Sequence, residues 1–192
     1  NKLIHFHIYI YQKHMYLFKF FTIIILLIIY YFYLSFIDWF IHKYIMHNDN
    51  TLLQSWRQEH IIHHKEFNNE IKKSNNYIEF TFSESIIIGI ISGIIIVFLL
   101  VFLYFKYKFD IKYIFYAFIL HITFIIIGAS IHNYSHSLFH KSTNISDCYR
   151  IQIPQFFTNI LHEHHLQHHN NCKKNFCTVF LGFDNIIGTN YK

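Results

Sequence analysis

Histidines are the residues of this 192-residue chain that could do chemistry, and there are 17 of them. Ten fall into four short spacings: H-x4-H, H-x2-H-H, H-x3-H and H-x2-H-H again. In chain order these are His42 and His47; His60, His63 and His64; His136 and His140; and His165, His168 and His169. At this abundance of histidine, a given H-x2-H-H triplet is expected roughly 0.13 times by chance, and the chain has two. The two triplets therefore indicate a metal site, since imidazole binds Fe, Zn, Cu and Ni.

Helical geometry shows how these spacings suit metal ions. At 100° per residue, each triplet falls within about a 100° arc and can aim several imidazoles at one point. His136 and His140 share a face one turn apart. His42 and His47 are about 140° apart, so we expect them to lie against different metals, with their helix between the two triplets. Ten ligands exceed the four of a tetrahedral zinc site and suit two ions with about five ligands each.

Other polar residues near the spacings are candidates for support. Asp38 and Asp184 are expected to accept the second ring N–H of the ligands and so fix their tautomer. His132 lies one turn before His136 and is a possible additional ligand. His121 lies within an apolar run, where it is either functional or a neutral histidine bonded to a neighbouring helix. The other histidines are expected in the cap or at the membrane interface: His5, His7, His14, His162 and His164.

The elements that must position these residues read as membrane spans. Apolar residues make up 53% of the chain and charged residues only 14%, more apolar surface than one core of this size can bury. Three uncharged runs, at 20–37, 85–105 and 113–131, are each long enough to cross a bilayer core of about 30 Å. Three buried helices of a soluble protein are the alternative, which the lack of a polar face disfavours.

We therefore expect an all-α integral membrane helical bundle of about three to four spans, forming a single domain over residues 1–192. The spans lie at about 17–37, 85–105 and 112–131, and a helical, histidine-rich cap on one membrane face comprises 38–84 and 132–192. Two spans separate the two groups of histidines, so both groups must emerge on the same face. Residues 106–112 predict a tight helical hairpin, and residues 1–14 an interfacial segment.

The charge and the cysteines of the chain indicate its partners and its compartment. The formal net charge is +5, but Lys and Arg are spread singly, which excludes a nucleic-acid partner. The three cysteines, Cys148, Cys172 and Cys177, form no C-x-x-C and fit a reducing compartment. Loop charges do not settle the orientation, and the cysteines favour a cytosolic histidine site. No cleavable signal peptide is expected, because the first long apolar run leads directly into the histidine-bearing sequence.

Five segments of the chain resemble the fatty acid hydroxylase (sterol desaturase) superfamily, from about residue 38 to residue 190. They are Asp38-Trp-Phe-Ile-His42-Lys-Tyr-Ile-Met-His47, His60-Ile-Ile-His63-His64, Tyr134-Ser-His136-Ser-Leu-Phe-His140-Lys141, His165-Leu-Gln-His168-His169, and Asn175-Phe176 with Phe183-Asp184-Asn185-Ile186-Ile187-Gly188-Thr189. Departures from the usual pattern are Lys43 for Arg, Cys177 for Gly, and Phe183 and Ile187 for Trp and Phe. None of these departures is at a ligand position, so metal binding is still expected. They affect the expected shape of the C-terminal tail and the fit of the substrate.

The resemblance implies a membrane enzyme in which the ten histidines hold a di-iron centre. Two Fe ions would use O2 as co-substrate to hydroxylate a long-chain lipid, either a fatty acid or a fatty acyl chain. Electrons would come from a separate donor of cytochrome b5 or ferredoxin type, since the chain has no G-x-G-x-x-G motif and no room for a haem domain. The location would be the endoplasmic reticulum in a eukaryote, and otherwise the cell membrane.

Three other functions stay open. Two belong to the same superfamily: a sterol desaturase or oxidase, and a carotenoid hydroxylase, whose third histidine box is usually H-x4-H. The third is a histidine-rich membrane protein that transports or stores metal. Transport predicts ionisable residues along the spans, and only His121 qualifies.

Overall fold

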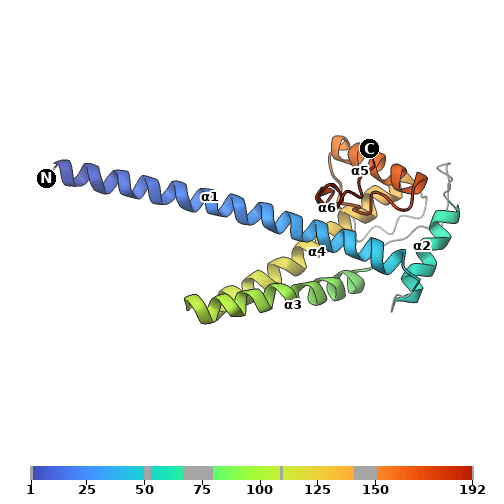
Figure 1. Cartoon of the computed structure of the whole chain (residues 1–192), viewed down its shortest axis with the longest axis horizontal. Helices are drawn as coiled ribbons and strands as arrows, with labels where there is room; N and C mark the ends of the chain where they lie inside the picture. The colour runs from blue at the N-terminus through green and yellow to red at the C-terminus, as the bar shows by residue number, and fades with distance from the viewer. Residues whose placement is uncertain (1, 50–52, 67–79, 109, 141–150, 192) are drawn as a thin grey trace.

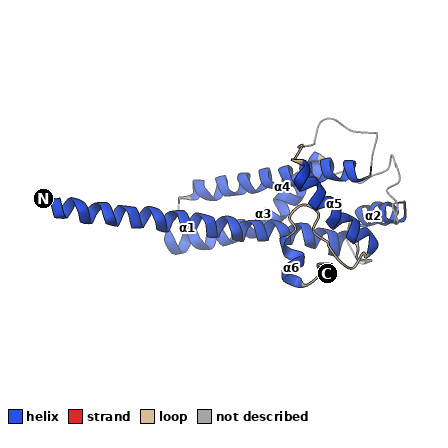
Figure 2. Ribbon diagram, turned by 90° about the horizontal axis from the view of Figure 1, so that it is seen from above, coloured by secondary structure: helices blue, strands red, loops and turns tan. Residues whose placement is uncertain are grey.

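The structure is a computed structural model that describes residues 2–49, 53–66, 80–108, 110–140 and 151–191. Over these ranges the elements are all helical, and Figure 2 draws no strand among them. Their order is α1 (Lys2–Phe40), the π-helical turn η1 (Ile41–Met46), α2 (Gln54–Glu66), α3 (Phe82–Tyr107), α4 (Ile111–Phe139), α5 (Gln155–Asn170) and α6 (Gly182–Ile187). The expected all-α class is confirmed for this part of the chain. Cys148, the cap segments 67–79 and 141–150, and the side chains of His5 and His7 lie outside the described residues.

Three helices are long and apolar enough to cross a membrane. The candidate spans are His14–Met46, Phe82–Lys106 and Ile111–Phe139, and each contains one of the apolar runs. At 1.5 Å per residue, α3 and α4 are about 39 Å and 43 Å long, more than a bilayer core of about 30 Å requires. The count of three lies within the expected range for the described residues.

Two helix boundaries differ from the expectation. Helix α1 is continuous from Lys2, so the first residues belong to the same helix as the first candidate span, which begins at His14. Helix α4 runs eight residues past 131, to Phe139, and so carries His132 and His136 itself. The reason is that the polar residues after 131 continue one helix face, and nothing in 131–139 breaks a helix. The third span therefore delivers histidines directly to the site.

Helices α3 and α4 form an antiparallel hairpin. Thr81 begins α3 with a capping box, in which its hydroxyl accepts from the Glu84 N–H and the Glu84 carboxylate accepts from the Thr81 N–H. Lys108 ends α3 in a left-handed conformation, and the Asp110 carboxylate accepts the Lys112 N–H at the start of α4. Gly89 allows close packing, since a Cβ there would lie 3.2 Å from Ile122 Cα.

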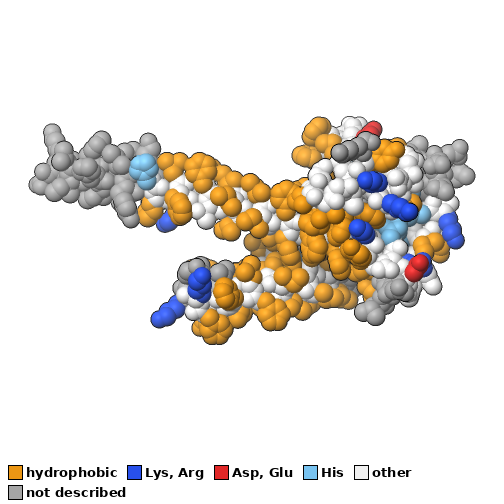
Figure 3. Space-filling view, in the orientation of Figure 1, with side chains coloured by type: hydrophobic (Ala, Val, Ile, Leu, Met, Phe, Trp, Pro, Cys, Tyr) orange, Lys and Arg blue, Asp and Glu red, His pale blue; other side chains and the backbone are white. Residues whose placement is uncertain are grey.

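Helix α1 meets this hairpin near one end and diverges from it towards the N-terminus (Figure 1). Where they meet, Leu34, Ile37 and Ile125 form a buried apolar cluster. Away from that contact the apolar side chains point outward: Phe18 is 73% exposed and Phe105 is 77% exposed. Figure 3 shows hydrophobic side chains along both arms and charged ones on the cap and at the hairpin tip. A large exposed apolar surface is typical of a site of contact with a membrane or with another protein.

The cap gathers where α1 and α4 end. Helices α2, α5 and α6 lie at this end of the molecule in both ribbon views (Figures 1 and 2). A second buried cluster, of Trp39, Phe176 and Cys177, fastens the C-terminal segment to the end of α1. Both histidine-bearing regions therefore reach the same end of the bundle.

Candidate metal centre

All ten histidines of the four spacings meet between the cap and the ends of the spanning helices. Their Nε2 atoms form two clusters. The first histidine group is His42, His47, His60, His64 and His168, and the second is His63, His136, His140, His165 and His169. The groups are neighbours, since the rings of His64 and His169 have centroids 4.4 Å apart.

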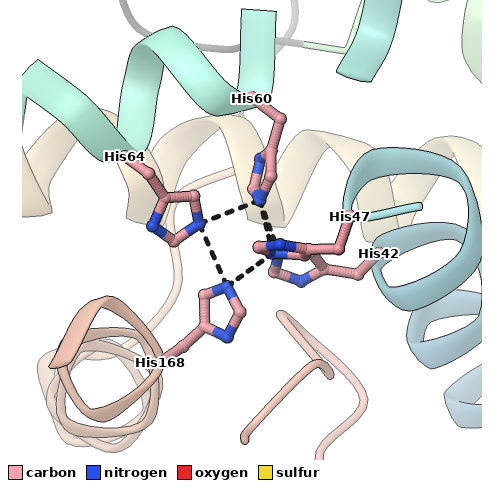
Figure 4. Close-up of side chains that lie close together, drawn as sticks. All are labelled: His42, His47, His60, His64 and His168. Atoms are coloured by element: carbon pink, nitrogen blue, oxygen red, sulfur yellow. Dashed lines mark hydrogen bonds between the residues drawn. The ribbon is translucent and has the colours of Figure 1, made fainter. Parts of the chain in front are cut away.

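Four nitrogens of the first group form a closed ring (Figure 4). His60 Nε2 lies 2.9 Å from His47 Nε2 and 3.0 Å from His64 Nε2. His168 Nε2 closes the ring at 3.1 Å from His47 Nε2 and 3.2 Å from His64 Nε2. The fifth nitrogen, His42 Nε2, is 3.0 Å from His60 Nε2. All five donor atoms lie within 4.8 Å of one another, as ligands of one ion would.

The second group is a similar set of close nitrogens. His63 Nε2 lies 3.3 Å from His136 Nε2 and 3.0 Å from His169 Nε2. His165 Nε2 lies 3.0 Å from His169 Nε2 and 3.2 Å from His140 Nε2. Every ring of this group is buried, and His63 is only 1% exposed.

The two triplets do not each serve one group, which corrects the expectation from their arc. On α2, His60 and His64 point into the first group and His63 into the second. On α5, His165 and His169 belong to the second group and His168 to the first. Residues four apart differ by only about 40° around a helix, whereas the third histidine lies 60–100° away and reaches the other side. Each cap helix therefore contributes two rings to one group and one ring to the other.

His42 and His47 also depart from expectation, because both belong to the first group. The prediction that they face different metals assumed an α-helix. They lie instead on the π-helical turn η1, in which the His47 N–H donates to the His42 carbonyl at 3.2 Å. A π-helical turn pairs residues i and i+5, so it brings both rings to one side.

Burial keeps these imidazoles neutral. It lowers the pKa of His47 to about 4. Burial, followed by the charges of neighbouring imidazoles, lowers the pKa of His168 to about 3. Burial lowers the pKa in the same direction for the others beyond the spans: His60, His63, His64, His140, His165 and His169. A neutral imidazole has a free lone pair on one nitrogen, which is the form that binds metal.

Two backbone carbonyls show which nitrogen of the ring carries the hydrogen. His42 Nδ1 lies 2.6 Å from the Phe176 carbonyl oxygen, and His168 Nδ1 lies 2.6 Å from that of Lys174. Only an N–H can bond to a carbonyl, so both rings carry their hydrogen on Nδ1 and a lone pair on Nε2. The other three rings of the first group can supply three N–H groups to its five close contacts. Each N–H group can donate to only one contact, so at least two contacts have no hydrogen between their nitrogens. Two nitrogens then face each other either lone pair to lone pair or N–H to N–H, and both arrangements are repulsive.

A cation between the rings removes this repulsion. Two ligand nitrogens at right angles around an ion, each about 2.1 Å from it, lie about 3.0 Å apart. The ring of the first group has edges of 2.9–3.2 Å, so its size fits an ion with histidine ligands. The residues present thus fit a transition-metal ion in each group, and imidazole alone does not identify the element.

Asp38 and Asp184 support the site in another way than expected. The Asp38 carboxylate accepts the N–H groups of Thr178, Val179 and Phe180 at 2.8–3.1 Å. The fully buried Asp184 carboxylate accepts the N–H groups of Phe176 and Cys177 at 3.1 and 2.7 Å. Direct bonds from these carboxylates to the ligand rings were predicted. The carboxylates bond to the backbone N–H groups of the loop instead, because these groups lie nearer to them.

The loop held by these carboxylates is what contacts the ligands. It carries the carbonyls of Lys174 and Phe176 that bond to His168 and His42. A carbonyl fixes a tautomer as a carboxylate does. No side-chain pattern marks a backbone carbonyl, so these two groups were not predictable from the residue types.

His132 stands beside the groups and outside both. Its ring stacks on that of His136 at 4.9 Å, with Phe80 on another side at 5.0 Å. It lines both of two neighbouring cavities, whose other shared lining residues are Asp38, Ile41, Phe80 and Thr178. His132 was expected as a possible additional ligand, but its ring belongs to neither histidine group. It lines the two cavities next to them.

The two cavities lead from the spanning helices to the histidines. The larger has apolar lining from α1, α3 and α4, including Leu34, Ile88 and Ile125. The smaller reaches His42 and His60 of the first group and His136 and His165 of the second. The cavity that borders both histidine groups therefore lies next to an apolar cavity inside the bundle.

The remaining described histidines have structural partners. His121 bonds through both ring nitrogens, to Tyr30 on α1 and Ser92 on α3, which favours the structural alternative for this residue. His162 stacks on Phe139 at 4.9 Å, and His164 Nε2 lies 3.6 Å from the Asp184 carboxylate. His14 is exposed on α1.

Asn133 is a supporting residue that sequence reasoning missed. Its side-chain amide donates to the Phe80 carbonyl at 2.8 Å and accepts the Phe80 N–H at 2.9 Å. This pair of bonds holds Phe80 where the two cavities join. The available signal was a polar amide on the histidine-bearing side of the third span, one residue after His132.

Comparisons of the chain with protein-family models, with curated proteins and with solved structures gave no match. What the site can do therefore follows from its own geometry: ten neutral nitrogen donors, in two adjacent clusters, at the closed end of an apolar space.

Proposed function

We propose that this chain is a membrane oxygenase that binds two iron ions in its histidine groups and hydroxylates a long-chain lipid. The observation that carries the proposal is the meeting of ten Nε2 atoms in two five-membered clusters above an apolar cavity. Iron is preferred among the metals that imidazole binds because the histidine boxes resemble those of di-iron lipid hydroxylases.

Hydroxylation would replace a C–H bond of the lipid by C–OH. One oxygen atom of O2 enters the product and the other leaves as water, which consumes two electrons and two protons. Bound iron would supply the oxidising chemistry. The electrons would come from a separate one-electron carrier of cytochrome b5 or ferredoxin type, and a cytosolic position of the cap would let such a carrier approach.

The chain's own residues would hold and orient the reactants. The Phe176 and Lys174 carbonyls fix His42 and His168 in the tautomer that binds metal. Phe80, held by Asn133, and Thr178, held by Asp38, border the passage between the cavities. Apolar walls from three helices exclude water and favour a hydrocarbon.

Metal transport is less well supported by the arrangement. A transported ion needs ligands along the spans, and His121, which lies within the third span, has both ring nitrogens bonded within the bundle. The sterol and carotenoid alternatives share the site and differ in substrate, so products must separate them.

Metal content and lipid products together test the proposal. Purified protein is expected to hold about two iron ions per chain, and cells that express it should accumulate a lipid heavier by one oxygen. His63→Ala and His168→Ala each remove one ring from a different group, and should lower bound iron and abolish the product. The control is His14→Ala, at an exposed position on α1.

Three results would contradict the proposal. Iron content at the wild-type level in both site variants would remove the metal assignment. Bound metal without any oxidised lipid would favour transport or storage. A lipid that has lost two hydrogens, or an oxidised sterol or carotenoid, would replace hydroxylation of a straight chain by one of the alternatives.

A further inference from the structure

A polar network lies behind the apolar residues that line the larger cavity, and its Tyr30 packs against the Leu34–Ile37–Ile125 cluster. Leu34, Ile88 and Ile125 line the cavity from three different helices. One helical turn farther from the histidine groups, on the same three helices, lie Tyr30, Ser92 and His121. These three side chains are bonded together.

The hydrogen bonds of this network can be assigned completely. The Ser92 hydroxyl has one hydrogen and donates it to the Ile88 carbonyl at 2.6 Å. It must therefore accept from His121 Nε2–H, 2.8 Å away. His121 Nδ1 is then a lone pair that accepts the Tyr30 hydroxyl hydrogen at 3.0 Å. The Tyr33 hydroxyl donates to the Ser92 carbonyl.

A network satisfied in this way is a rigid barrier. His121 is 1% exposed and has no free nitrogen for a ligand or an ion. The rings of Tyr33 and Phe124 pack beside the network, with Tyr33 centred 5.8 Å from His121 and Phe124 centred 5.5 Å from Tyr30. To extend the cavity past this layer, three helices would have to part and several buried hydrogen bonds would have to break.

We propose that the Tyr30–Ser92–His121 network is the floor of a binding site for one unbranched hydrocarbon chain, and that it limits how much of the chain can lie below the histidines. Reading the cavity as the substrate site rests on the proposed function. The apolar lining excludes a charged headgroup, so the methyl end enters first and stops at the floor. From Ile125 to His136, along α4, the distance is about 17 Å. The oxidised carbon would then lie at a fixed count from the methyl end.

Binding of saturated fatty acids to the metal-free protein tests the floor without catalysis. The protein is held in an amphipathic polymer, so that no detergent competes, and fatty acids of 8 to 18 carbons displace radiolabelled dodecanoate. Affinity should rise about fourfold for each added methylene until the cavity is filled. Beyond that length it should level off, because further carbons stay outside the cavity.

Two variants of one residue separate the floor from its hydrogen bonds. Tyr30→Ala removes the ring and should move the levelling-off to longer chains. Tyr30→Phe removes only the hydroxyl and should leave the levelling-off length unchanged. A second pair covers the case in which Tyr30→Ala fails to fold. Ala129→Phe fills the cavity above the floor and should weaken the binding of long chains at least tenfold, whereas Ala117→Phe, on the same helix and outside the cavity lining, should not.

Several outcomes would overturn the inference. They are affinity that keeps rising to 18 carbons in the wild type, no binding of any chain, or an unchanged levelling-off length in folded Tyr30→Ala. With an active enzyme, two substrates that differ by two carbons should be oxidised at the same distance from the methyl end, and a constant distance from the carboxyl end would also contradict it. Because the binding assay contains no metal, the floor can fail while the oxygenase stands, and the reverse.

Discussion

At the scale of single residues, two rings of the histidine site are oriented by main-chain carbonyls, which carry no net charge. The ring nitrogens of His42 and His168 that face away from the first group bond to main-chain carbonyls. The buried carboxylate nearby, Asp184, holds the backbone of the same loop. Asp184 thus fixes the loop through hydrogen bonds, and the loop carbonyls in turn orient the imidazole rings of His42 and His168.

Asp184→Asn is expected to weaken this chain of contacts. The amide keeps the size of the carboxylate but offers one acceptor oxygen where two N–H groups now bond. At least one buried N–H loses its partner, so the free energy of unfolding should fall by about 1–3 kcal/mol. Thermal unfolding in detergent measures this loss, and metal content should also fall. Asn185→Asp, at the exposed neighbouring position, is the matched control, and equal metal content in both variants would show that the loop does not orient His42.

The neutral histidines give the metal-free protein a pH dependence of known sign. Burial lowers the pKa of His47 and His169 to about 4, and that of His140 and His168 to about 3, against about 6.5 when unfolded. The unfolded chain therefore binds more protons below pH 6.5, and stability falls as the pH drops from about 6.5 to 4. Thermal midpoints measured between pH 4 and 8 should rise up to about pH 6.5 and then level off. A midpoint independent of pH over this range would contradict burial of neutral rings.

At the scale of elements, each cap helix joins the two groups. Helices α2 and α5 each place two rings in one group and one in the other, and the ends of α1 and α4 supply the remaining pairs. Neither group can form unless both cap helices are in place. The H-x2-H-H spacing is the smallest that does this on one helix, since i and i+4 share a side and i+3 leaves it.

The sequence alone predicted the spans, the shared face and the ten converging histidines, because composition and spacing determine these directly. It did not predict which ring joins which group. That depended on the π-helical turn at Ile41–Met46, which no residue type marks, and on how α2 and α5 face each other across the site. The roles of Asp38 and Asp184 were also wrong in detail, since both carboxylates bond to the backbone N–H groups of the loop at 176–180 and not to the ligand rings.

The contact between α4 and the start of α3 is expected to be sensitive to Asn133. Asn133→Leu removes both bonds to the Phe80 backbone and leaves a partly buried N–H and carbonyl without this partner. The free energy of unfolding should fall by about 1–3 kcal/mol. Phe80 should also become mobile, so the binding of hydrocarbon chains should weaken along with stability. Thr123→Leu, at an exposed position on the same helix, tests whether any polar-to-leucine change has this effect. An equal fall in stability and in chain binding in both variants would contradict a special role of the Asn133–Phe80 hydrogen bonds.

At the scale of the whole molecule, the chain separates a hydrocarbon arm from a polar cap. The spans diverge away from the cap (Figure 1), and apolar side chains cover the face of both arms that Figure 3 shows. Most rings of the histidine groups are buried where the spans meet. In the proposed oxygenase, a substrate from the bilayer would reach the metals without crossing water, and an electron donor would approach from the cap side.

This arrangement predicts that the cap and the hairpin tip lie on opposite sides of a membrane. Cys172 is exposed on the cap, and Lys106 is exposed near the tip of the α3–α4 hairpin. The first variant carries Cys148→Ser, so that Cys172 is its reactive thiol. The second variant carries Lys106→Cys together with Cys148→Ser and Cys172→Ser. Both variants keep the buried Cys177. A membrane-impermeant maleimide added to intact cells should label the hairpin thiol and not Cys172, if the histidine groups face the cytosol. Opening the membrane with detergent should make Cys172 reactive, which shows that its protection came from the bilayer. Labelling of both thiols from one side would contradict the spans, because α3 and α4 are each longer than the hydrocarbon core and must separate their ends.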